Sequence, residues 1–129
     1  MEALGATVVD RPKSSYYLCT FDAVCTQDTF DLCVKASAPG GKVVEFGMFW
    51  TPVQMTNAML FKEVSVVPAM GYVHAYGIDD FRQAADHLSV NRTVADVVVT
   101  HTFGLDDAAE AFRVAADRAS GAIKVHLAP

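Results

Sequence analysis

The sequence lacks several features by which other classes of protein are recognised. No apolar run approaches the roughly 18 residues of a membrane-spanning helix, and no basic start followed by an apolar block marks a secretory signal. Basic residues are also few, since 10 Lys and Arg stand against 15 Asp and Glu and give a formal net charge of −5. Nucleic acids and anionic membranes are bound mainly through Lys and Arg. We therefore predict no nucleic acid partner and no membrane partner, and we expect a cytoplasmic protein.

Closely spaced metal ligands are absent as well. Cys19, Cys25 and Cys33 are an odd number of cysteines and form no C-x-x-C pair. We interpret them as buried thiols in a reducing compartment. The sequence also contains no Glu-x-x-His motif, so no zinc is expected in this chain.

Strand and helix signals alternate along the chain. With 52% hydrophobic residues, a chain of 129 residues has ample material for one core. The alternation is typical of a parallel α/β sheet with flanking helices. Strands are expected at 7–9, 17–21, 42–46, 64–67, 97–100 and 123–127, and helices at 26–37, 52–60, 78–88 and 105–116. Thr26 or Asp28 caps the first helix, and the run 64–67 is expected to be buried on both faces because it does not alternate.

Several blocks of the sequence, in order, resemble one family. The blocks are 21–24 (FDAV), 38–47 (APGGKVVEFG), 60–67 (LFKEVSVV), 80–84 (DFRQA), 100–106 (THTFGLD) and 108–127 (AAEAFRVAADRASGAIKVHL). They are similar to segments of the zinc-type (medium-chain) alcohol dehydrogenase family, in its C-terminal part. Cys25 stands where that family usually has glycine.

The resemblance implies a partial Rossmann-type fold. Residues 1–70 would form the second half of the nucleotide-binding domain, and 71–129 a C-terminal segment that the family places in its GroES-like substrate domain. The sequence has no G-x-G-x-x-G loop, whose backbone amides hold the coenzyme pyrophosphate. We therefore expect a fold that lacks the first βαβ unit, in a fragment or truncated member of the family.

The resemblance also assigns coenzyme-binding positions. Strand-tip residues would face the nicotinamide, Cys25 and Thr26 would lie near its ribose, and a basic residue would reach the pyrophosphate. The tip residues are Phe46, Gly47, Ala69, Met70 and Gly71, and the basic residue is Lys124. Each has a structural alternative: Phe46 and Ala69 are also suited to a plain core, and Lys124 to a solvated strand.

Two functions follow from this reading. The family reaction is NAD- or NADP-dependent hydride transfer between an alcohol and an aldehyde or ketone, with zinc polarising the oxygen. No catalytic residue is assigned in this chain, which we expect to be inactive alone. The alternative is a non-catalytic α/β module, either a homodimer joined through the edge strand near Val64–Val67 or half of a domain that a partner chain completes.

Overall fold

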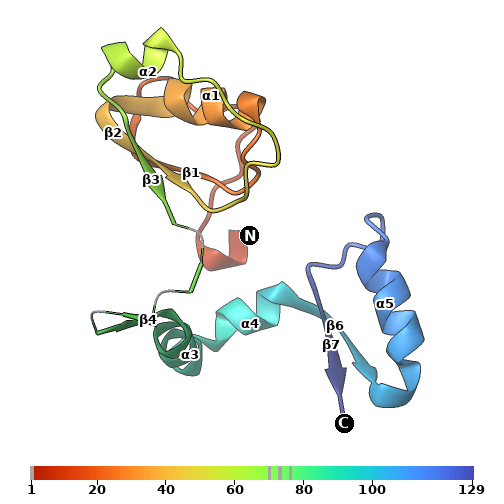
Figure 1. Ribbon diagram of the computed structural model, residues 1–129. Helices are drawn as coiled ribbons and strands as arrows, with labels where there is room; N and C mark the ends of the chain where they lie inside the picture. The colour runs from red at the N-terminus through yellow and green to blue at the C-terminus, as the bar shows by residue number, and fades with distance from the viewer. Residues whose placement is uncertain (1, 70, 73, 76) are drawn as a thin grey trace. The chain divides into compact units, whose positions relative to one another are not determined.

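The computed structural model describes residues 2–69, 71–72, 74–75 and 77–129. They form two compact units, Val9–Tyr72 and a second unit made of Met1–Val8 with Val73–Pro129 (Figure 1). The predicted α/β class is confirmed, because each unit contains a parallel sheet flanked by helix. The assignment of the segment after residue 70 to a substrate domain stays a prediction.

The unit of residues 9–72 is a three-stranded parallel sheet with both of its helices on one side (Figure 1). Its elements are β1 (Tyr17–Asp22), α1 (Gln27–Ala36), β2 (Ser37–Glu45), α2 (Asn57–Phe61) and β3 (Ser65–Pro68), in the sheet order β1-β2-β3. Parallel neighbours need crossover connections, and α1 and α2 supply them.

Helix α1 begins and ends where the sequence chemistry dictates. Thr26 caps it, since its hydroxyl accepts a hydrogen bond from the Thr29 amide while the Thr29 hydroxyl accepts one from the Thr26 amide. At the other end, Lys62 Nζ donates to the carbonyls of Val34, Lys35 and Ser37 at 2.8–3.1 Å. The last carbonyls of a helix lack amide donors within the helix, so the lysine amine supplies the missing donors. Its positive charge also interacts favourably with the negative, C-terminal end of the helix dipole.

The core of this unit lies between α1 and the sheet. Phe30 and Val34, one helical turn apart, pack on Val43 of β2 and on Val64 just before β3. The opposite face of the sheet carries Phe21, Val44 and Val67, which are register partners across the three strands. Phe21 is 60% exposed and Val67 38% exposed. The expectation that the run 64–67 is buried on both faces is therefore wrong, because within the described unit only one face of the sheet is covered.

The second unit is built around a βαβ motif. Its elements are η1 (Glu2–Leu4), β4 (His74–Ala75), β5 (Ile78–Asp79), α3 (Asp80–Val90), α4 (Arg92–Val98), β6 (Val99–Gly104), η2 (Leu105–Asp107), α5 (Ala108–Ala116) and β7 (Lys124–Ala128). Strands β6 and β7 pair in parallel, and β4 and β5 form an antiparallel hairpin. Ala111 alone is buried among the residues of this unit whose burial is described, 2–8, 77 and 79–129, so most of their apolar surface is accessible.

Three boundaries differ from the sequence prediction. Residues 7–9 form no strand, the helix expected from Pro52 begins only at Asn57, and the valines at 97–98 end helix α4 before β6 begins at Val99. In each case the run of β-branched or apolar residues was too short for its pattern to separate strand, helix and loop.

Candidate functional site

The candidate site is the edge at which the parallel strands β1, β2 and β3 end. Asp22, Glu45 and Pro68 are register partners and close the three strands at the same level. The Phe46 amide donates to the Asp22 carbonyl at 2.8 Å, and the Ala69 amide donates to the Glu45 carbonyl at 2.9 Å. In open α/β sheets, ligands bind outside this carboxyl edge. The strand order places the predicted tip residues there.

Four of the predicted coenzyme-binding residues lie together at this edge. Gly47 packs against Cys25, because a Cβ added to the glycine would lie 2.9 Å from Cys25 Sγ and 3.0 Å from the Ala23 carbonyl oxygen. Phe46 is stacked on Phe21 with ring centroids 5.4 Å apart. The Phe46 ring is 49% exposed, which excludes the plain-core alternative for this residue. Thr26 follows Cys25 directly and is committed to capping α1.

Ala69 also lies at this edge, where its amide donates to the Glu45 carbonyl. Ala69 is exposed and continues β3, and Gly71 is exposed with φ 122°. Met70 lies outside the described residues. Lys124 is exposed and begins β7 in the other unit, where it pairs with Val99. The assignment of all eight residues to coenzyme binding stays a prediction.

Behind the strand tips, on the side of α1, lies a buried polar cluster of Asp22, Cys25 and Glu45. One ligand atom of each lies within 4.8 Å of the others. Asp22 Oδ1 accepts hydrogen bonds from the amides of Val24 and Cys25, both at 2.9 Å, and Oδ2 accepts one from the Thr29 hydroxyl at 2.8 Å. The Cys25 thiol donates to Glu45 Oε2 at 3.0 Å. Each of the three residues is 2% exposed.

Burial controls the protonation of this cluster. Burial, followed by the hydrogen bond to Glu45, raises the pKa of the Cys25 thiol to about 11. Burial also raises the pKa of the Glu45 carboxyl, against the opposing effect of the hydrogen bond from Cys25. No described Lys, Arg or His forms an ion pair with Asp22 or Glu45. The Cys25 thiol is buried and donates its proton to a carboxyl, an environment typical of an unreactive cysteine.

The cluster was not predicted as a unit. Glu45 stands out in the sequence as a carboxylate within an otherwise apolar strand, and Asp22 is part of a block that resembles a strand end. Their pairing depends on the register between β1 and β2, and Cys25 joins them because its φ of 59° turns the chain back over the strand tips. A cysteine in this left-handed region is uncommon, since glycine adopts it at lower cost.

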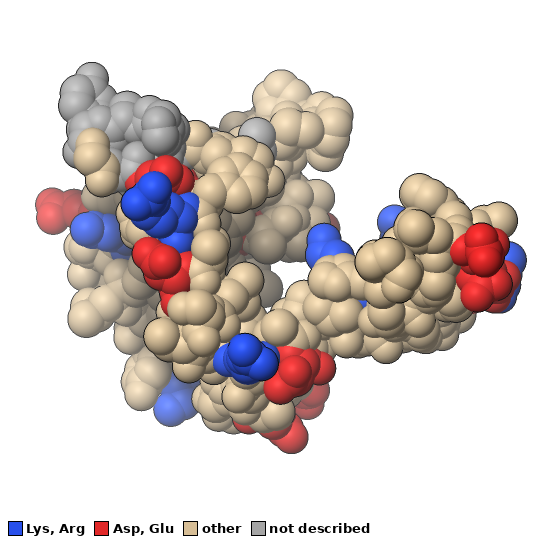
Figure 2. Space-filling model, turned by 90° about the horizontal axis from the view of Figure 1, so that it is seen from below, with Lys and Arg blue, Asp and Glu red and all other residues tan. Residues whose placement is uncertain are grey.

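The charged surface offers no concentrated basic patch on the face drawn in Figure 2, where Lys and Arg are interspersed with Asp and Glu. None of the helices in the described part of the chain combines the length and apolar character that a bilayer crossing requires.

The comparisons with known proteins rest on structure. No protein-family model and no curated protein matches the chain. Among solved structures, L-idonate 5-dehydrogenase of Escherichia coli K-12 is similar with a TM-score of 0.71 at 18% identity, over 91% of this chain. The 2R,3R-butanediol dehydrogenase of Bacillus subtilis gives a TM-score of 0.70 at 21% identity over 89%. A Sinorhizobium meliloti protein described as a putative zinc-binding dehydrogenase, solved with NADP bound, gives 0.69 at 20% over 89%.

The fold is that of part of these dehydrogenases. The chain spans about a third of the length of each, since the match covers 32% of every one of the three. The resemblance seen in the sequence blocks is thus confirmed at the level of the fold, including its partial Rossmann-like sheet. At these identities the likeness to the dehydrogenases concerns architecture, and the reaction requires a separate argument.

Proposed function

We propose that the chain is the nicotinamide-side part of an NAD- or NADP-dependent alcohol dehydrogenase of the zinc-type, medium-chain family. The observation that carries the proposal is that β1, β2 and β3 end at the same register position. Cys25, Phe46, Gly47 and Ala69 follow the strand ends at this carboxyl edge of the sheet. The similar fold of a protein solved with NADP supports a nicotinamide coenzyme.

The chain would bind and orient the nicotinamide ring. The Phe46 and Ala69 amides are already bonded within the sheet, and the Gly47 amide interacts with the Cys25 sulfur, so contacts to the ring carboxamide fall to the other backbone groups at Gly47 and Gly71. At Gly71 nothing lies within 4 Å of an added Cβ, so a ligand could approach this backbone closely. When bound, the coenzyme would supply hydride transfer, and the family's catalytic zinc, for which no ligands are assigned in this chain, would polarise the substrate oxygen.

We expect this chain alone to be inactive towards alcohols, because it carries neither the phosphate-binding loop nor an assigned catalytic zinc site. The proposal is tested by calorimetric titration of NADH and NADPH into the purified chain, with the mass in solution determined by light scattering. Micromolar binding to a defined oligomer would support it, and Lys124→Ala would show whether the basic residue takes part. Absence of binding at millimolar coenzyme would refute coenzyme binding by this chain.

A second candidate function is assembly, as a cytoplasmic α/β module for dimerisation or completion by a partner chain. The uncovered face of the β1-β2-β3 sheet favours it, because parallel sheets normally have both faces covered. Strand β3 is an outer strand, as a dimer through the segment near Val64–Val67 requires. Pro68 lacks an N–H, which confines edge pairing to the residues before it.

A further inference from the structure

Neither function proposed above explains the buried cluster of Asp22, Cys25 and Glu45, although Cys25 is also one of the predicted coenzyme-edge residues. It brings two carboxyl groups and a thiol together in a site that is closed to solvent, and no described basic residue pairs with it. Buried carboxylates are normally compensated by a cation or by hydrogen bonds to every oxygen. Asp22 meets that rule through its three donors, whereas Glu45 does not.

The decisive observation is Glu45 Oε1. This oxygen is buried and has no hydrogen-bond partner among the described residues. The other oxygen of the same carboxyl accepts the Cys25 thiol proton at 3.0 Å. Glu45 therefore has an oxygen that can accept a hydrogen bond or bind a cation, and no described residue donates to it. Its neighbours in the cluster, a carboxyl and a thiol, bind metals in their anionic forms.

We propose that Asp22, Cys25 and Glu45 form a binding site for a thiophilic divalent cation of the Zn²⁺ class. The thiol selects borderline and soft ions over Mg²⁺ and Ca²⁺, which prefer oxygen ligands alone. The ion replaces the thiol proton, and the Glu45 proton where the carboxyl holds one, and these protons leave to solvent. This reverses the expectation from ligand spacing that the chain contains no zinc site.

To accept the ion, the Cys25 sulfur and the Glu45 oxygen must move apart by about half an ångström, and the widest-spaced ligand atoms must move closer together. Tetrahedral zinc with ordinary bond lengths holds sulfur and oxygen ligands roughly 3.3–3.6 Å apart. The Cys25 Sγ to Glu45 Oε2 distance is 3.0 Å, and the widest separation in the cluster is within 4.8 Å. Asp22 is already oriented by two amides and the Thr29 hydroxyl, the kind of outer support that metal-binding carboxylates use. Three protein ligands leave one position for water or another small ligand.

The test uses the full chain under a phosphine reductant, titrated with Co²⁺ and with Zn²⁺. One Co²⁺ per chain is expected, with thiolate-to-cobalt charge-transfer absorption that Zn²⁺ abolishes. Cys25→Ser should remove the absorption, and both Cys25→Ser and Glu45→Gln should lower the affinity for Zn²⁺ by about 100-fold or more, because loss of even an outer supporting group costs about 10- to 100-fold. Mg²⁺ at the same concentration should not compete.

The matched control is the double variant Cys19→Ser, Cys33→Ser, which removes the other two thiols and should leave both signals unchanged. Far-UV circular dichroism checks that each variant is folded. If a cluster variant fails to fold, alkylation of the wild type decides instead, because bound Zn²⁺ should slow peptide-mapped labelling of Cys25 and not of Cys19. Charge-transfer absorption that survives Cys25→Ser, that disappears in the control, or that is absent at millimolar Co²⁺ would overturn the proposal.

Discussion

Cys25 and Gly47 show how one residue choice constrains another at the strand tips. The cysteine occupies a left-handed conformation with φ 59° and places its sulfur where Gly47 leaves room. Glycine at 47 is required by this contact and by the Ala23 carbonyl. The pair therefore links the conformation of the turn after β1 to the start of the loop after β2.

Gly47→Ala should lower the free energy of unfolding by about 1–3 kcal/mol, because the new methyl group would lie 2.9 Å from Cys25 Sγ and 3.0 Å from backbone. Gly104→Ala is the matched control: its φ is −70° and nothing lies within 4 Å of an added Cβ. Urea unfolding followed by far-UV circular dichroism measures both variants. Equal stability of the two would show that the strand tips do not have the described packing.

Glu45→Gln should change how stability depends on pH. Because the pKa of Glu45 is raised in the folded chain, the fold holds this proton more tightly than the unfolded chain does. The associated stability is fully present below the ordinary glutamate pKa and is lost as the pH rises through the raised pKa. Glutamine cannot ionise, so it avoids this loss.

The difference in unfolding free energy, variant minus wild type, should therefore increase from pH 4 to pH 8. Urea unfolding in the presence of a chelator measures the difference, and contributions from the other acidic groups cancel in it. A difference that is constant with pH, or that decreases, would contradict the burial of an ionisable Glu45.

At the residue scale the sequence predicted positions better than contacts. Phe46, Gly47 and Ala69 were placed at strand tips from the block resemblance, and the structure has them there. The cluster of Asp22, Cys25 and Glu45 could not be predicted, because it depends on cross-strand register and on the left-handed turn at Cys25. Cross-strand register has no local sequence signature. A left-handed turn is usually signalled by glycine, and here cysteine occupies that position.

At the scale of elements, α1 offers a direct test of a sequence signal. Thr26 and Asp28 were both suitable caps, and the structure uses Thr26. Thr26→Ala should lower the free energy of unfolding by about 0.5–2 kcal/mol, since it leaves orphan amides at the helix start. Thr56→Ala is the control, because Thr56 begins α2 without a side-chain cap hydrogen bond. Comparable losses in the two variants, measured by urea unfolding, would argue against the capping box.

Elements were predicted well where periodicity was long and poorly where it was short. The helices at 27–36 and 80–90 have apolar residues over several turns, and both formed near their expected positions. The runs at 7–9 and 97–98 contain only two or three β-branched residues each, too few to separate strand from helix or loop. Only pairing with a neighbouring strand resolves such runs, as β7 does for β6 from Val99 onwards.

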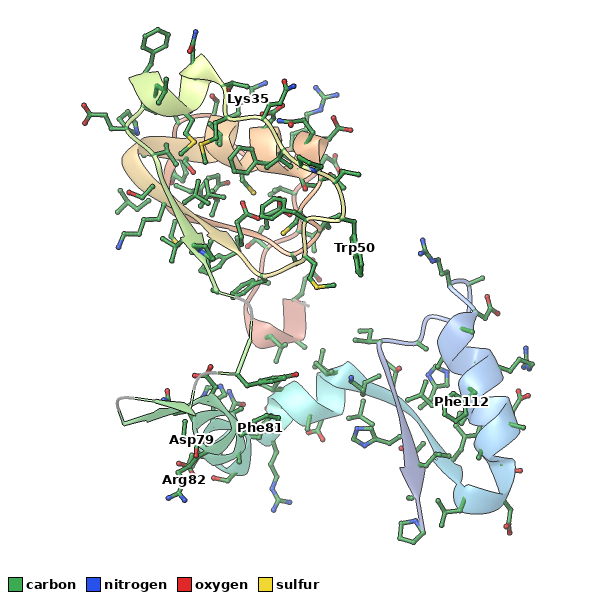
Figure 3. All side chains as sticks on the ribbon, viewed as in Figure 1. Lys35, Trp50, Asp79, Phe81, Arg82 and Phe112 are labelled. Atoms are coloured by element: carbon green, nitrogen blue, oxygen red, sulfur yellow. The ribbon has the colours of Figure 1, made fainter. Side chains whose placement is uncertain are left out.

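At the scale of the whole molecule, the most prominent feature is the amount of apolar surface that remains accessible. Trp50 is 82% exposed and projects from its loop, and Phe112 is 74% exposed on α5 (Figure 3). In the sheet of residues 9–72, Phe21, Val44 and Val67 form a row on the uncovered face. A row of neighbouring apolar side chains such as Phe21, Val44 and Val67 is typical of surfaces that contact another protein.

The assembly function makes its own prediction about this row. The chain should self-associate in solution, and Phe21→Glu should raise the dissociation constant at least about tenfold. Burying a phenylalanine side chain contributes about 1.5–3 kcal/mol, and about 1.4 kcal/mol corresponds to a factor of ten. Light scattering and sedimentation over a range of concentrations measure the change.

Phe61→Glu is the control for a general effect of added charge, because Phe61 is 84% exposed on α2, on the helix-covered side of the same sheet. It should leave the dissociation constant unchanged. Equal weakening by both variants would show that association does not use the uncovered sheet face. A wild type that stays monomeric up to millimolar concentration would exclude self-assembly and leave completion by a different chain as the form of the assembly function to test.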